Sequence, residues 1–103
     1  MSELAQNIGS YLAELQRANA SPHTLRNYRS DLEQFLDYFS RNGDEPPAAN
    51  AFDMLLLREW MGHLYQKRLD PISIRRKLAA VRSLFTFLRR EGVVGTNWAR
   101  LLR

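Results

Sequence analysis

The sequence contains no cysteine, which excludes disulfide scaffolds, thiolate zinc sites and cysteine nucleophiles. Its two histidines, His23 and His63, lie too far apart for an H-x-x-x-H or H-E-x-x-H metal motif. The five glycines are scattered through the chain rather than gathered into a phosphate-binding loop. We therefore expect no catalytic residue, no metal and no other cofactor in this chain.

Long hydrophobic runs are also absent. No apolar segment approaches the roughly 18 residues that a membrane span needs, and Glu3 stands where a signal peptide carries basic residues. We therefore expect a cytoplasmic protein. With 103 residues, 45% of them hydrophobic, the chain is expected to form a single domain over residues 1–103.

Charge is distributed unevenly along the chain. Residues 1–66 contain five basic and nine acidic side chains, whereas residues 67–103 contain ten basic and two acidic ones. Thirteen of the fifteen basic residues are arginine, which favours bidentate recognition of phosphate and of base edges. The basic last third suggests a polyanionic partner.

Four stretches repeat apolar residues every three or four positions, which predicts α-helices, and none alternates as a strand does. Each predicted helix follows a residue that can cap its N-terminus, namely Ser2, Ser21, Asp53 or Asp70. Proline occupies the first position of the second and fourth helices, where its missing N–H costs nothing.

The expected ends of these helices follow from glycine and basic residues. The first should end near residues 17–18, the second at Gly43, the third near residues 67–68, and the fourth at residues 89–90 with Gly92 as its terminator. Residues 43–52 are predicted to be a loop that joins two helical hairpins, and residues 97–102 a single helical turn. The predicted fold is all-α, an orthogonal bundle of four main helices with a short C-terminal turn.

The fourth predicted helix contains the most informative pattern. At about 100° per residue, one side of it collects five arginines with only small residues between them and no acid. The arginines are Arg75, Arg76, Arg82, Arg89 and Arg90, and the spacers are Ala79, Ser83 and Thr86. Such a face can approach a phosphate backbone or enter a major groove. The alternative is a solvated face, but solvated faces normally mix both signs of charge.

The second predicted helix has a smaller basic feature at its start. Its polar side carries His23, Arg26, Asn27, Ser30 and Gln34, with Arg29 at the margin of the core, whereas its far end is acidic. That polarity would direct the helix N-terminus, with its unpaired N–H groups and positive dipole end, toward phosphate. An ordinary polar face with a capping motif explains the same pattern equally well.

Two blocks resemble a known family. Residues 21–35 are similar to the pattern S-x-x-T-L-x-x-Y-x-x-D-L-x-x-F, and residues 73–88 resemble S-I-x-R-K-L-x-x-L-R-S-F-F-x-F-L. Both patterns are typical of the N-terminal core-binding, SAM-like domain of tyrosine recombinases, and most closely of the Xer branch. The chain departs from the family at residues 97–99, where Asn-Trp-Ala replaces the usual Asn-Pro-Ala.

The resemblance implies a C-shaped clamp, in which this domain grips one face of a double-stranded DNA half-site and a separate C-terminal domain grips the other. The second and fourth helices would cross in the major groove. The family's catalytic residues belong to the C-terminal domain, so this chain is not expected to cleave DNA. The full-length protein would exchange strands through a phosphotyrosyl intermediate together with other recombinase subunits, whereas the isolated domain is expected to be a monomer.

The predicted DNA contacts combine the two helical faces with the family motifs. They are Thr24, Arg26, Asn27, Arg29, Ser73, Arg75, Arg76, Lys77, Arg82 and Arg89. Arg76 and Arg82 rank highest because both the arginine face and the motif select them. Two alternatives remain, a helical protein-interaction module and a stand-alone nucleic-acid-binding regulator. Phe87, which falls off the apolar stripe, is a candidate for a contact surface.

Overall fold

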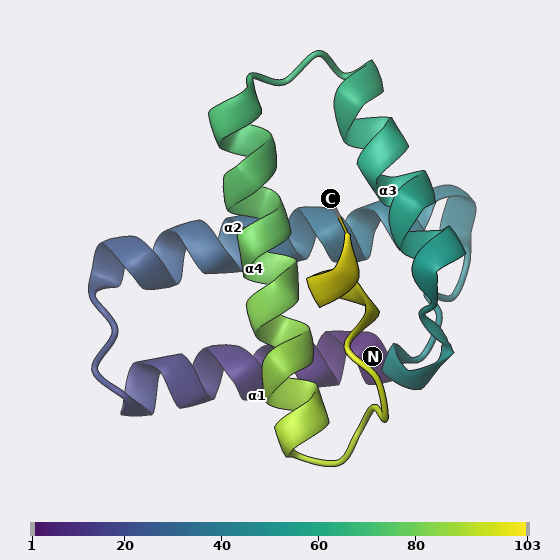
Figure 1. Ribbon diagram of the computed structural model, residues 1–103. Coiled ribbons are helices and arrows are strands. Elements are labelled where there is room, and N and C mark those ends of the chain that lie inside the picture. The colour runs from purple at the N-terminus through teal and green to yellow at the C-terminus, as the bar shows by residue number, and fades with distance from the viewer. Residues whose placement is uncertain (1, 103) are drawn as a thin grey trace.

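The computed structural model describes residues 2–102, and all its regular elements within that range are helical (Figure 1). The four α-helices are α1 (Glu3–Arg17), α2 (Pro22–Phe39), α3 (Met54–Gln66) and α4 (Pro71–Arg90). Three short 3-10 helices complete the fold, η1 (Arg41–Gly43), η2 (Ala49–Ala51) and η3 (Trp98–Leu101). The prediction of an all-α bundle with four main helices and a short C-terminal turn is therefore confirmed.

All four predicted N-caps form as the sequence indicates. In each helix the side-chain oxygen of the capping residue accepts a hydrogen bond from a backbone N–H of the first turn, which satisfies one of the donors that a helix start leaves unpaired. The pairs are Ser2 with Ala5, Ser21 with Thr24, Asp53 with Leu56, and Asp70 with Ser73.

The predicted end of the second helix was wrong. α2 ends at Phe39, and the chain continues through Ser40 into η1 before it reaches Gly43. The Ser40 hydroxyl donates to the carbonyl of Leu36 at 2.8 Å, and Asn42 already adopts a left-handed φ of 64°. The backbone N–H of Ser40 already bonds to the carbonyl of Asp37 in a 3-10 pattern, so the α-helical hydrogen bonds stop before either left-handed residue is reached. The predicted loop over 43–52 also contains η2.

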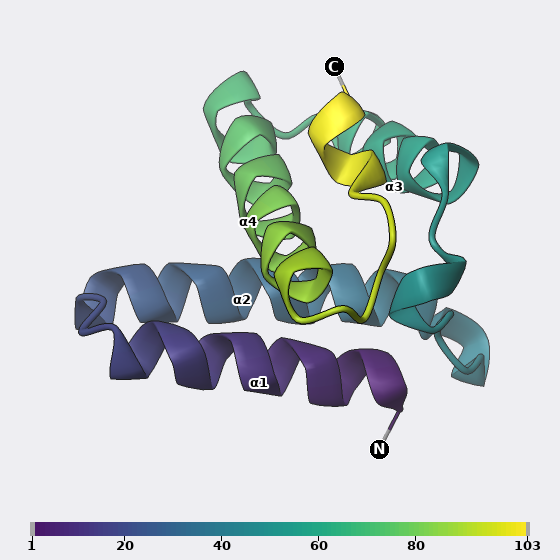
Figure 2. The same ribbon diagram turned by 60° about the horizontal axis from the view of Figure 1, so that its bottom comes forward.

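The helices form two layers. α1 and α2 lie side by side and antiparallel, and α4 crosses over both of them (Figures 1 and 2). η3 lies between α4 and α3. The centre of the core is Phe35, whose ring lies 5.0–5.4 Å from those of Phe39, Phe52 and Trp60 and 6.4 Å from that of Phe85. These aromatic contacts join α2, α3, α4 and the chain before α3.

Phe87 belongs to the core rather than to a contact surface. Its side chain is only 7% exposed, and its ring lies 5.3 Å from that of Tyr11 on α1. The buried face of α4 is wider than the apolar stripe because α1 packs across the C-terminal half of that helix. The assignment of Phe87 to a contact surface was therefore wrong.

Within residues 2–102, no helix has both the length and the apolar character required to cross a membrane. Over the same range, histidine, aspartate and glutamate side chains nowhere gather into a group able to hold a metal ion.

Candidate nucleic-acid interface

The exposed side of α4 is the arginine-rich face that the sequence predicts. Arg75, Arg76, Arg89 and Arg90 are exposed, and the small residues between them leave the helix backbone approachable. The twenty residues of α4 include no aspartate or glutamate. The face therefore offers guanidinium groups without competing carboxylates from its own helix.

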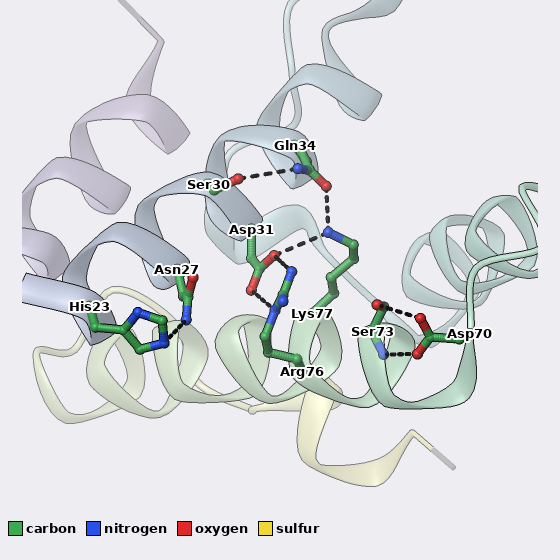
Figure 3. Close-up of polar contacts among 9 residues, drawn as sticks. All are labelled: His23, Asn27, Ser30, Asp31, Gln34, Asp70, Ser73, Arg76 and Lys77. Carbon is green, nitrogen blue, oxygen red and sulfur yellow. Dashed lines mark hydrogen bonds and ion pairs between the residues drawn. The ribbon is translucent and has the colours of Figure 1, made fainter.

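A buried carboxylate ties α4 to α2 where the two helices cross. Asp31 on α2 is 1% exposed, and its Oδ2 accepts a hydrogen bond from Arg76 Nε at 3.0 Å. Its Oδ1 accepts from Arg76 Nη2 and from Lys77 Nζ, both at 3.1 Å. Figure 3 shows both cationic side chains reaching from α4 to this single carboxylate. Because a carboxylate in a core needs such partners, the pair of cations fixes the crossing of α2 and α4.

The two cations at the crossing differ in accessibility. The side chain of Lys77 is 8% exposed and also donates to Gln34 Oε1 at 2.6 Å, so its charge is used inside the protein. The side chain of Arg76 is 47% exposed, and its hydrogen bonds to Asp31 raise its pKa above the ordinary value. Arg76 therefore stays charged at any relevant pH, with part of its guanidinium facing solvent.

Arg82 is half-buried and fastens the end of the described chain to α4. Its Nε donates to the carbonyl of Ala99 at 2.9 Å, and its Nη2 donates to the carbonyl of Leu102. Ala99 and Leu102 are themselves buried. Arg82, which ranked among the strongest predicted DNA contacts, thus has its donors engaged by the main chain of η3 and the residue after it.

The start of α2 supplies the second part of the basic face. Arg26 and Arg29 are exposed, and Thr24 and Asn27 are half-buried. The amide nitrogen of Asn27 lies 3.2 Å from Nε2 of His23, which holds both side chains along the edge of α2 that faces the crossing (Figure 3). Arg29, expected at the margin of the core, is exposed instead.

Ser73 lies in the first turn of α4 and serves its cap. Its backbone N–H and its hydroxyl both donate to the carboxylate of Asp70, at 2.9 and 3.1 Å. These hydrogen bonds hold the pKa of Asp70 below its usual value. The hydroxyl proton of Ser73 is therefore directed at Asp70 (Figure 3).

The structure also brings forward residues that the sequence did not single out. Glu14 on α1 forms a salt bridge with Arg90 on α4, with 2.5 Å between Oε2 and Nη2. Arg100 on η3 is exposed beside the C-terminal half of α4. Spacing places Arg90 on the arginine face, but a contact between residues 76 positions apart leaves no periodic signal that could identify Glu14 as its partner.

Comparison with known proteins places most of the chain in one family. Residues 8–92 match the family model of the phage integrase N-terminal SAM-like domain. A tyrosine recombinase XerC of Syntrophus aciditrophicus (strain SB) is 35% identical over 102 residues, which cover 94% of this chain and 32% of the relative. A tyrosine recombinase XerC of Pelobacter propionicus is 36% identical over 103 residues, covering 99% of this chain and 34% of the relative.

The relatives are much longer than this chain. A third one, the tyrosine recombinase XerC of Oceanobacillus iheyensis, is 36% identical over 98 residues, covering 94% of this chain and again 32% of its own length. The chain thus spans about a third of the length of the curated relatives it matches. No solved structure matches the chain.

Proposed function

Because this chain belongs to the family of phage integrase N-terminal SAM-like domains, we propose that it binds double-stranded DNA as the N-terminal part of a tyrosine recombinase of the Xer type. The observation that carries this proposal is the exposed face of α4, where arginines and small residues alternate without an acid. A helix of that composition can lie in a major groove with its guanidinium groups on the flanking phosphates.

The predicted contact residues divide into two groups by whether their hydrogen-bond donors remain available to a phosphate. The direct contacts we propose have exposed or half-buried side chains on the two helices, and they are Thr24, Arg26, Asn27, Arg29, Arg75, Arg76 and Arg89. Three other predicted residues, Ser73, Lys77 and Arg82, act from behind this surface, because their polar atoms bond to other parts of the protein. They hold α4 and its neighbours in place for the contacts.

Most of these contacts should be to phosphates. Arginines spread along two helices neutralise backbone charge wherever the duplex lies, whereas base recognition needs a side chain that reaches into the groove. We expect weak binding with little sequence preference, with a Kd of about 10⁻⁴–10⁻⁶ M at physiological salt. Each phosphate contact should contribute about 0.9 to the slope of log K against log[salt].

Recombination itself is proposed for the longer protein. The relatives named tyrosine recombinase XerC extend well beyond the region that matches this chain. In this proposal strand cleavage and exchange belong to that further region, and the present domain grips one face of a half-site in the cytoplasm, beside other recombinase subunits. The domain would contribute affinity and orientation rather than chemistry.

The test is fluorescence anisotropy with a labelled duplex at several salt concentrations. Arg75→Gln removes an exposed charge from the N-terminal part of the α4 face, and Arg58→Gln removes an exposed charge from α3 as a matched control. We expect Arg75→Gln to weaken binding several-fold and to lower the salt slope by about 0.9. Arg58→Gln should match the wild type. Equal behaviour of the two variants, or binding that tolerates salt, would contradict the proposal and favour a protein-interaction module.

A further inference from the structure

A hollow of 320 Å³ lies where η3 folds back against the C-terminal half of α4. Its lining comes from both elements and from the residue that caps η3, and it consists of Thr86, Arg89, Arg90, Asn97 and Arg100. We call it the α4–η3 pocket. A neighbouring hollow of 300 Å³ shares Arg89, Asn97 and Arg100 in its lining.

The side chain of Asn97 holds the two sides of this pocket together through hydrogen bonds to η3 and to α4. Its Oδ1 accepts a hydrogen bond from the backbone N–H of Arg100 at 3.2 Å, which caps η3. Its Nδ2 donates to Thr86 Oγ1 at 3.1 Å, which joins that cap to α4. Asn97 is 6% exposed, so both bonds are largely shielded from water. Together with the bonds from Arg82, they bring Arg100 next to the arginines at the end of α4.

The pocket gathers positive charge without a carboxylate in its lining. Three of its five lining residues are arginines, and none is acidic. Arg90 is bonded to Glu14 and Glu91 outside the pocket. Among residues 2–102, no salt bridge involves Arg89 or Arg100. Arginines that line the same pocket repel one another unless an anion lies between them, and phosphate is an anion whose geometry guanidinium matches well.

We propose that the α4–η3 pocket binds one phosphodiester group of the DNA backbone, with Arg89 and Arg100 as its direct ligands. The identity of the anion rests on the proposed function, whereas the pocket itself rests on the geometry of η3. This site extends the DNA-binding surface beyond α2 and α4, because Arg100 enters it only through the fold of residues 97–101. It adds one phosphate contact to those of the helical faces.

Two variants test the pocket by anisotropy with the same duplex. Arg100→Gln removes one ligand, and Asn97→Asp keeps the oxygen that caps η3 while it places a carboxylate in the pocket. We expect Arg100→Gln to lower the salt slope by about 0.9, and Asn97→Asp to weaken binding at least as much. Arg58→Gln is the control for a lost surface charge. Thermal unfolding of each variant checks that the fold is retained.

The outcomes separate this proposal from the proposed function. If Arg75→Gln weakens binding but Arg100→Gln and Asn97→Asp behave like Arg58→Gln, the pocket is wrong and DNA binding by α4 stands. If the wild type shows no salt-dependent DNA binding, the proposed function fails.

Inorganic phosphate provides a second measurement on the pocket alone. NMR signals of the Arg89 and Arg100 Nε–H groups should shift with phosphate more than with chloride at equal ionic strength. An absence of such shifts would overturn the pocket as an anion site. Shifts with inorganic phosphate, combined with duplex affinity that does not depend on Arg100, would indicate a site for free phosphate and overturn its assignment to DNA.

Discussion

Replacing Asp31 by alanine should destabilise the domain more than any change on its surface. The substitution removes three hydrogen bonds at the crossing of α2 and α4, two from Arg76 and one from Lys77. The side chain of Arg76 is 47% exposed, so water can solvate its charge once the partner is lost. The side chain of Lys77 is 8% exposed and would retain only Gln34, a neutral partner.

The expected loss of folding free energy therefore comes mainly from Lys77, whose buried charge would have no carboxylate partner. Breaking one side of a buried ion pair costs about 3–5 kcal/mol, a large part of the roughly 5–15 kcal/mol that stabilises a domain. In a chain of this size, each kcal/mol lowers Tm by about 4–8 °C, so Asp31→Ala should lower it by at least about 12 °C. Urea unfolding followed by circular dichroism measures the free energy, and a thermal scan measures Tm.

A double variant makes the test sharper. Asp31→Ala with Lys77→Met removes the stranded charge as well, and buried pairs replaced by apolar groups often lose little stability. We expect the double variant to be more stable than Asp31→Ala alone by at least about 1.5 kcal/mol. A loss below about 1 kcal/mol for Asp31→Ala, or a double variant no more stable than the single one, would refute the assignment of Asp31 as the group that holds the crossing.

Three further predictions concern single contacts. Arg82→Ala should expose the amides of η3 to hydrogen exchange and cost about 1–3 kcal/mol, because it leaves two main-chain carbonyls without their donor; unchanged exchange would contradict the clamp. Asp70 has a folded pKa below its usual value, so its contribution to stability is present above that value and is lost as pH falls through the folded pKa. Asp70→Asn should therefore flatten the fall of the urea midpoint below about pH 4, and an unchanged pH profile would argue against it. Glu14→Gln should free Nη2 of Arg90, whose Nε stays paired with Glu91, and so strengthen DNA binding; equal affinity at low salt would show that this salt bridge does not compete with DNA.

Much of the fold follows from local signals in the sequence. Proline and the capping residues Ser21 and Asp70 specify the starts of α2 and α4 through bonds within one turn. Gly92 stops α4 with a φ of 78°, as its position indicates. The end of α2 was missed because the α-helical hydrogen bonds change to a 3-10 pattern at Ser40, ahead of the left-handed Asn42 and Gly43. A glycine signal marks a left-handed residue, but it does not fix how many residues separate that residue from the last α-helical one.

The candidate site was predicted in outline but not in detail. Helical periodicity correctly predicts that arginines lie on the solvent-facing side of α4, and Arg75 and Arg89 are exposed as expected. Spacing cannot reveal that Arg82 bonds to carbonyls 17 and 20 residues later in the chain. Lys77 did carry a signal, since it lies next to the apolar stripe of α4, and a basic residue in such a position suggests a buried partner. That partner, Asp31, lies 46 residues earlier.

The most direct test of the central claim is an amide NMR titration of the labelled domain with a short DNA duplex at two salt concentrations. We predict salt-sensitive shifts gathered at residues 22–30 and 73–90, extending to residues 97–101 where η3 completes the α4–η3 pocket. No shifts, or shifts centred on α1 that persist at high salt, would contradict DNA binding by α2 and α4.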